Sequence, residues 1–213
     1  MIDSDLIFGV SRKLHSALGT TSQFDSKSSD LSLVSLMKES DLKIKNTEGY
    51  FNLLDQKKTS DLKFASFDKD KDRRKNFLIH AFLMIEESIE ITINDKSFNK
   101  NKFWVLICNY IRVCLMLTDF IQEYEKKNVL IELNHMIDSV NTDILFLKSW
   151  ILFMQAKILY QLNYIKDAKT TLDLAQKMYF ENYSDFYFAL QDDYGKTYWE
   201  EYSLKLQNDL SKS

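Results

Sequence analysis

Apolar residues recur every three or four positions over most of the chain beyond residue 76. This spacing matches the 3.6-residue period of an amphipathic helix, and it runs first from 76 to 92. Polar stretches interrupt the pattern, which then predicts further helices over 103–126, 129–140, 144–162, 164–180 and 184–210. The chain has no proline and 4 glycines, so the residues that usually mark strand ends and turns are rare. We therefore expect an all-α fold.

The first part of the chain has a different pattern. Residues 2–18 carry apolar residues at helical spacing, with Asp3 or Ser4 placed to cap the helix and Gly19 placed to end it. Residues 19–30 are rich in serine and threonine, a composition typical of a linker. We expect the helix to dock on the rest of the protein, or on a partner, from this tether.

Residues 31–38 and 49–54 contain enough apolar side chains for short helices, but their surroundings are polar and show no long period. We therefore interpret residues 1–75 as an N-terminal helix followed by a partly ordered polar arm. Residues 76–213, in which the apolar content stays high, form the expected helical-repeat-like domain.

The clearest local signal is residues 156–179, AKILYQLNYIKDAKTTLDLAQKMY. This stretch reads as two short amphipathic helices joined at Leu162 and Asn163. Alanines stand at 156, 168 and 175, where large side chains would hold the two helices apart. The pattern predicts a helical hairpin that stacks on its neighbours.

The hairpin resembles a tetratricopeptide repeat. The residues that carry the resemblance are Ala156 and Tyr160 in the first helix, an Asn-Tyr turn, and Ala168, Leu172 and Ala175 in the second helix. The resemblance implies a short, irregular stack of antiparallel hairpins, which the helix over 184–210 would cap. Another α-helical bundle remains the alternative fold.

A stack needs a second copy of its unit, because one hairpin cannot bury its own apolar face. A shift of 35 residues upstream is close to the family's period of about 34, but it meets large residues in place of the alanines, namely Leu133, Ile137 and Val140. In addition, Leu152 stands where the family favours Trp, and no proline closes the second helix. The resemblance therefore covers one clear unit, at about 150–180, and one degraded unit before it.

Proteins built from this repeat bind proteins or peptides in a groove lined by the first helix of each unit, and the resemblance implies the same here. The residues that would face the groove are Trp150, Phe153, Lys157, Tyr160 and Gln161. Aromatic side chains with one base suit a partner segment that has apolar anchors and an acidic group. The aromatic residues fit a buried core position equally well.

The net charge indicates which classes of partner to expect, and the cysteine content indicates the cellular compartment of the protein. Lys and Arg number 28 and Asp and Glu number 31, a net charge of -3, so no overall field attracts nucleic acid or an anionic membrane. Cys108 and Cys114 are six positions apart in an apolar run and are expected to stay unpaired. Free thiols and the acidic start of the chain favour the cytoplasm.

The apolar run over 103–121 approaches the length of a membrane span. Asn109 and Arg112 lie near its middle, where polar groups are costly in hydrocarbon. We therefore expect a buried core helix and no membrane partner.

No motif predicts a metal site or a cofactor. His15, His80 and His135 lie far apart without acidic or cysteine neighbours at ligand spacing. The acidic residues at 68–72 start like a calcium loop, but Arg73 stands where a glycine must turn the chain. We expect no metal site and no cofactor.

One weaker enzymatic pattern remains. Arg74 and His80 are separated by five residues and resemble the Arg-x(4 to 6)-His motif of HEPN ribonucleases, whose two residues cleave RNA together. They would share one face only if a helix began between them, since six residues turn a helix by about 600°.

The sequence thus favours a non-enzymatic protein-interaction module of the adaptor, scaffold or chaperone-like kind. A HEPN-like ribonuclease and an obligate helical subunit of a larger complex are the alternatives.

Overall fold

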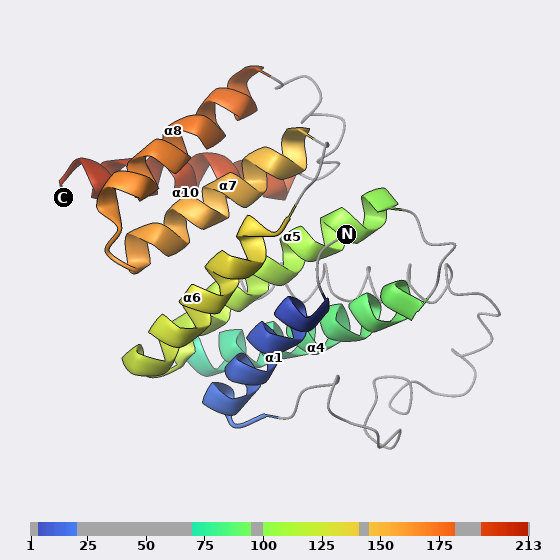
Figure 1. The fold of residues 1–213 in the computed structure, drawn as a ribbon. Coiled ribbons are helices and arrows are strands. Elements are labelled where there is room, and N and C mark those ends of the chain that lie inside the picture. Colours follow the sequence, from blue (N-terminus) through green and yellow to red (C-terminus); the bar gives the residue numbers. More distant parts are fainter. Residues whose placement is uncertain (1–3, 21–69, 95–99, 141–144, 182–192, 213) are drawn as a thin grey trace. The chain divides into compact units, whose positions relative to one another are not determined.

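The structure, a computed structural model, describes residues 4–20, 70–94, 100–140, 145–181 and 193–212. Its helices are α1 (Ser4–Leu18), α4 (Lys71–Asn94), α5 (Lys100–Leu117), the 3₁₀ helix η3 (Thr118–Phe120), α6 (Glu123–Asp138), α7 (Leu145–Gln161), α8 (Ile165–Glu181) and α10 (Asp193–Ser211) (Figure 1). These described residues contain helices and no strand, so the predicted all-α class is confirmed.

The chain divides into two compact units, residues 7–129 and residues 1–6 with 130–213. This division differs from the expected boundary between residues 75 and 76. The difference arises because most of α1 packs in the same unit as α4 and α5. The expected short helices at 31–38 and 49–54 and the expected first part of the last helix, residues 184–192, lie outside the described residues.

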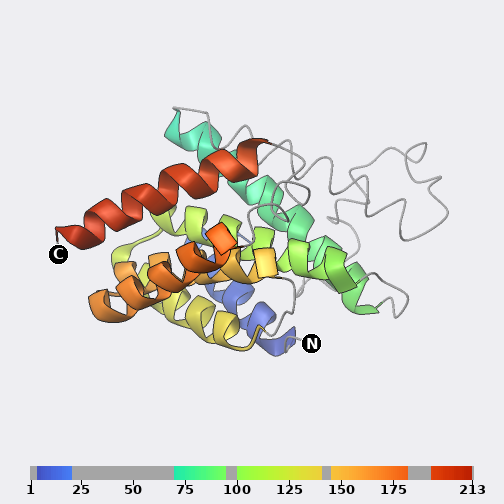
Figure 2. The same cartoon turned by 90° about the horizontal axis from the view of Figure 1, so that it is seen from above.

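The unit formed by residues 7–129 is built on the antiparallel pair α4 and α5 (Figure 1). The two helices follow each other closely along the chain, and both views show them side by side (Figure 2). α1 contributes three apolar residues with no exposed surface, Ile7, Val10 and Leu14. Large apolar residues of α4 and α5, such as Phe82 and Trp104, complete the buried interior. The docked arrangement that the sequence allowed for the N-terminal helix is therefore the one observed.

The apolar run that was expected to form one helix over 103–126 is broken, and this prediction was wrong. α5 ends at Leu117, η3 follows, and Ile121 has extended backbone with φ -114° and ψ 166°. The Thr118 hydroxyl donates to the Leu115 carbonyl at 2.7 Å, which gives the end of the helix a local hydrogen bond. α6 then begins at Glu123, earlier than the expected residue 129.

Among the described residues, the window Phe103–Phe120 is long and apolar enough to cross a membrane by length and composition, and it is the one helix of this kind there. Of this window, 72% is buried inside the protein. The buried residues include Arg112, which the sequence placed near the middle of the run. Burial of this kind is typical of a core helix, which passes the same test of length and composition.

In the second unit, α7 and α8 form the predicted antiparallel hairpin (Figure 1). Ala156, Ala168 and Ala175 each have 0% exposure, which is the packing that their spacing predicted. The Ser149 hydroxyl of α7 donates to the Ala175 carbonyl of α8 at 3.0 Å. A hydroxyl can reach a backbone carbonyl on the other helix only where the two helices approach closely. α10 packs against both members of the hairpin (Figure 2).

A left-handed residue ends α7 and starts the hairpin turn. Asn163 has φ 67°, a conformation that asparagine tolerates better than most residues. The Tyr164 amide donates to the Leu159 carbonyl at 2.8 Å, and the Asn163 amide donates to the Tyr160 carbonyl at 3.0 Å. These two bonds form a Schellman motif, which satisfies carbonyls that the helix end would leave unpaired.

The same motif ends α1 at the glycine that the sequence identified as its stop. Gly19 has φ 69°, the Thr20 amide donates to the His15 carbonyl at 3.0 Å, and the Gly19 amide donates to the Ser16 carbonyl at 3.4 Å. The turn therefore fixes the backbone of Thr20 directly beside the last turn of α1.

Replacing Gly19 by alanine is expected to lower the free energy of unfolding by about 1–2 kcal/mol, because an L-residue is strained at this φ. A Cβ at Gly19 meets nothing within 4 Å, so the cost comes from the backbone alone. Gly9 offers a matched control, since its Cβ also meets nothing and its φ is ordinary. Gly9→Ala should raise stability by about 0.5–1 kcal/mol. Urea denaturation followed by circular dichroism measures both, and equal effects of the two changes would contradict this account of the turn.

Candidate functional site

The residues expected to line a groove lie on α7, and the structure separates them into two groups. Trp150 and Phe153 are 7% and 1% exposed, and their rings meet edge to face with centroids 6.4 Å apart. Lys157, Tyr160 and Gln161 are partly exposed. The two aromatic residues are therefore packing residues in this structure, and the other three form the accessible part of the expected site.

Helix geometry brings the three accessible residues together. Tyr160 and Gln161 lie three and four positions after Lys157, so each of their side chains is a neighbour of the Lys157 side chain on the surface of α7. The Schellman turn at Asn163 follows directly and fixes where this face ends. The Gln161 Oε1 atom is buried and accepts no hydrogen bond from the described residues. We name these three residues the α7 surface.

Arg74 and His80 are not brought together. α4 begins at Lys71, before both of them, so they are six residues apart within one helix and point in different directions. The Arg74 guanidinium carbon lies 5.9 Å from the centre of the Phe120 ring, and the Lys71 amine lies 5.8 Å from it, distances typical of cation–π contacts. The His80 side chain is exposed. The condition under which the two residues would share a face is therefore not met.

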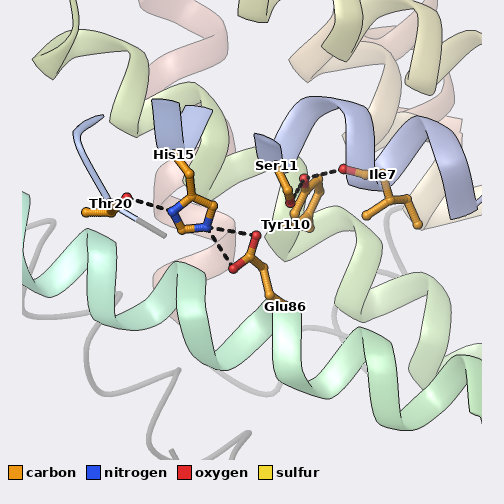
Figure 3. A network of polar contacts seen from close by, with 6 residues as sticks. All are labelled: Ile7, Ser11, His15, Thr20, Glu86 and Tyr110. Carbon is orange, nitrogen blue, oxygen red and sulfur yellow. Dashed lines mark hydrogen bonds and ion pairs between the residues drawn. The ribbon is translucent and has the colours of Figure 1, made fainter. Parts of the chain in front are cut away.

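The most elaborate polar cluster of the described residues lies inside the first unit and was not expected (Figure 3). His15 of α1 and Glu86 of α4 are 2% and 0% exposed. His15 Nε2 lies 3.0 Å from Glu86 Oε1 and 2.9 Å from Oε2, and His15 Nδ1 lies 2.6 Å from Thr20 Oγ1. Both ring nitrogens therefore have a polar partner, as a buried imidazole requires.

A second set of hydrogen bonds joins α1 to α5 beside this imidazole (Figure 3). The Tyr110 hydroxyl donates to the Ile7 carbonyl at 3.0 Å, and the Ser11 and Tyr110 hydroxyl oxygens are 2.7 Å apart. Because the single phenolic proton goes to the carbonyl, the Ser11 hydroxyl is the donor to Tyr110. The Phe82 ring lies between the two sets, with centroids 5.0 Å from His15 and 5.7 Å from Tyr110. We name the residues of both sets the α1 cluster. They are Ile7, Ser11, His15, Thr20, Phe82, Glu86 and Tyr110.

Burial and neighbouring charges raise the pKa values of one phenol and two thiols on α5. Burial, then the neighbouring Cys114, and to a smaller extent Glu86, hold the pKa of Tyr110 well above its ordinary value of 10.0, against the Ser11 hydrogen bond that lowers it. Burial followed by the charge of Glu86 raises the pKa of the Cys114 thiol well above 9.0. Burial raises the pKa of the Cys108 thiol to about 12. Both cysteines are free, and with such pKa values neither thiol is a reactive thiolate at neutral pH.

The buried face of α4 carries several polar side chains. Glu87, Ser88 and Thr92 are buried together with Glu86. The Ser88 hydroxyl donates to the Met84 carbonyl at 2.7 Å, and the Thr92 hydroxyl donates to the Ser88 carbonyl at 2.6 Å. Each hydroxyl therefore has its hydrogen-bond acceptor within the same helix. Local bonds of this kind let a helix bury hydroxyl groups without partners on other helices.

Sequence reasoning missed the α1 cluster because its members are far apart in the chain. Glu86 is 71 positions from His15, and Tyr110 is 99 positions from Ser11. The sequence did hold one signal. Ser11 and His15 are one turn apart and continue the line of Ile7 along the apolar face of the first helix. Polar residues on such a face need buried partners, although the face does not identify them.

Within the described residues, no group of three or more His, Cys, Asp or Glu side chains is placed to hold a metal ion. Comparisons with protein-family models, with curated proteins and with solved structures gave no match. The tetratricopeptide resemblance therefore stays a prediction.

Proposed function

We propose that this chain is a non-enzymatic helical module that holds a segment of a partner protein against the α7 surface. The observation that carries the proposal is the partial exposure of Lys157, Tyr160 and Gln161 as neighbours on one helix face. An aromatic ring, a flexible cation and an amide on one face match the way in which helical modules anchor a peptide. The expected location is the cytoplasm, which agrees with the two free cysteines.

The surface proposed here is smaller than the groove that the sequence suggested. Trp150 and Phe153 are buried, so we leave them out of the contact. The partner chemistry follows from what remains. An apolar anchor suits the Tyr160 ring, and an acidic side chain suits the Lys157 amine.

Replacing Tyr160 by a photo-crosslinking phenylalanine derivative in the full chain should capture the partner, which mass spectrometry identifies. The same derivative at Lys169, an exposed position on α8, is the matched control. With the captured partner purified, Tyr160→Ala and Lys157→Glu should each raise the Kd by roughly tenfold or more. Neither change should move the melting temperature by more than about 3 °C, because both side chains are partly exposed.

Two outcomes would overturn the proposal. Unfolding of the Tyr160→Ala protein would show that the ring is a core residue. Equal capture from positions 160 and 169 would show that the α7 surface has no selectivity. Permanent association with another chain in sedimentation experiments would instead favour the obligate-subunit alternative.

A further inference from the structure

Part of the α1 cluster has the arrangement of an activated nucleophile. The Thr20 hydroxyl lies 2.6 Å from one nitrogen of the His15 ring, and the other ring nitrogen lies 2.9 and 3.0 Å from the two Glu86 oxygens (Figure 3). A hydroxyl within hydrogen-bond reach of a base, with the base oriented by a third group, is the geometry by which Ser and Thr side chains become nucleophiles. The hydroxyl, the imidazole and the carboxylate come together although Glu86 is distant in sequence.

The carboxylate fixes which ring nitrogen can accept a proton. A carboxylate only accepts hydrogen bonds, so the His15 Nε2 atom, which faces both of its oxygens, carries the hydrogen. In the neutral ring the Nδ1 atom then has its lone pair directed at Thr20, and the Thr20 hydroxyl is the donor. Glu86 thereby holds the ring as a base for the Thr20 proton.

Burial separates the roles of the three groups. His15 is 2% exposed and Glu86 is 0% exposed, whereas Thr20 is partly exposed. Thr20 is therefore the one of the three residues that a reagent from solvent can reach. The Schellman turn at Gly19 holds the Thr20 backbone through its amide bond to the His15 carbonyl at 3.0 Å. The hydroxyl and its base are thus positioned by the same turn of chain.

We propose that Thr20 is a covalent acylation site, whose hydroxyl reacts with activated acyl esters. The Thr20 oxygen attacks the acyl carbon and forms a new ester, while its proton passes to His15 Nδ1. The bond from the acyl carbon to the leaving oxygen breaks, and the electron pair departs with that oxygen. The proton then leaves His15 to the leaving group or to water. His15 is the base and Glu86 is a positioning residue.

This site is independent of the partner-binding proposal. Thr20, His15 and Glu86 all belong to residues 7–129, and the α7 surface belongs to the other unit. Loss of one activity therefore leaves the other to be measured on the same protein.

The test treats the full-length protein with p-nitrophenyl acetate at pH 8 and follows p-nitrophenolate release, with the acetylated residue located by tandem mass spectrometry. Acetylation is expected at Thr20, with at most one equivalent released quickly. Thr170 is the matched control, because it is exposed and its hydroxyl donates to the Lys166 carbonyl at 3.1 Å instead of to a base. Position 20 should react at least roughly tenfold faster than position 170.

Variants decide whether His15 activates the hydroxyl. Thr20→Val should abolish acetylation at position 20, and Thr20→Ser should retain it, because a serine hydroxyl can make the same bond. His15→Gln should slow it by roughly 100-fold, with folding checked by circular dichroism. If His15→Gln does not fold, the rate of acetylation at Thr20 relative to Thr170 in the unaltered chain decides the matter. Equal acetylation of Thr20 and Thr170, acetylation confined to other residues, or a rate at Thr20 unchanged in folded His15→Gln would each overturn the proposal.

Discussion

The His15→Ala protein is expected to lose about 3–5 kcal/mol of unfolding free energy at pH 7, the range seen when one partner of a buried pair is removed. The imidazole lies within 2.9 Å of the Glu86 carboxylate, which is 0% exposed and which water cannot solvate in its place. The change also removes a ring that packs on Phe82. Urea denaturation followed by circular dichroism gives the free energy directly.

Control variants separate loss of the buried contact from loss of a histidine as such. His80→Ala, on the exposed side of α4, should change stability by no more than about 0.5 kcal/mol. Replacing His15 and Glu86 together by leucine should restore a large part of the loss, because the double change leaves no charge buried. A His15→Ala loss below about 1 kcal/mol would show that the cluster relaxes at little cost, contrary to the geometry described.

The Ala168→Leu protein is expected to be destabilised by about 1–3 kcal/mol, because Ala168 is fully buried at the crossing of α7 and α8. Three added carbon atoms must either separate the helices or displace the side chains around them. Separation would also lengthen the contact between the Ser149 hydroxyl and the Ala175 carbonyl, now 3.0 Å. Thermal and urea unfolding of the full chain measure the change.

The neighbouring Lys169 provides the control for this substitution. Lys169 is exposed on the same helix, so Lys169→Leu should change stability by no more than about 0.5 kcal/mol while adding the same side chain. A stable, tightly folded Ala168→Leu protein would mean that the crossing has spare volume. In that case the alanine spacing would no longer support a resemblance to a closely packed repeat.

The hairpin could be derived from the sequence because each of its determinants is local. The helical period, the alanines at the crossing and the turn at Asn163 all lie within one short segment. The same holds for the end of α1, where the expected stop at Gly19 is a left-handed glycine. Local conformational preference and local packing agree at these positions, and such agreement makes a segment predictable.

The break between α5 and α6 could not be derived in the same way. The apolar period continues through Leu117 and beyond, and no glycine or proline marks the end of the helix. The end depends on a side-chain hydrogen bond of Thr118 and on an extended residue, Ile121. Periodicity measures which face of a helix is apolar, so it does not register where the backbone leaves the helix.

The candidate functional residues differ in the same way: some follow from a short segment of sequence, and others depend on contacts between distant segments. The α7 residues could be predicted as a candidate surface because they follow from the hairpin, although burial removes Trp150 and Phe153 from the accessible set. The α1 cluster was not found, since the spacing of the histidines in the sequence shows no acidic neighbour for His15. Its partner Glu86 is supplied by a helix that begins more than fifty residues later in the chain.

By itself the sequence determined the all-α class, most of the helices and the close crossing of α7 and α8, because these follow from periodicity and side-chain size over short stretches. Only the tertiary structure decided that α1 packs with α4 and α5, and that His15 meets Glu86 and Thr20. The physical reason is that a polar residue on an apolar helix face must have a hydrogen-bond partner once it is buried. Which residue becomes that partner depends on how helices that are distant in the sequence pack together.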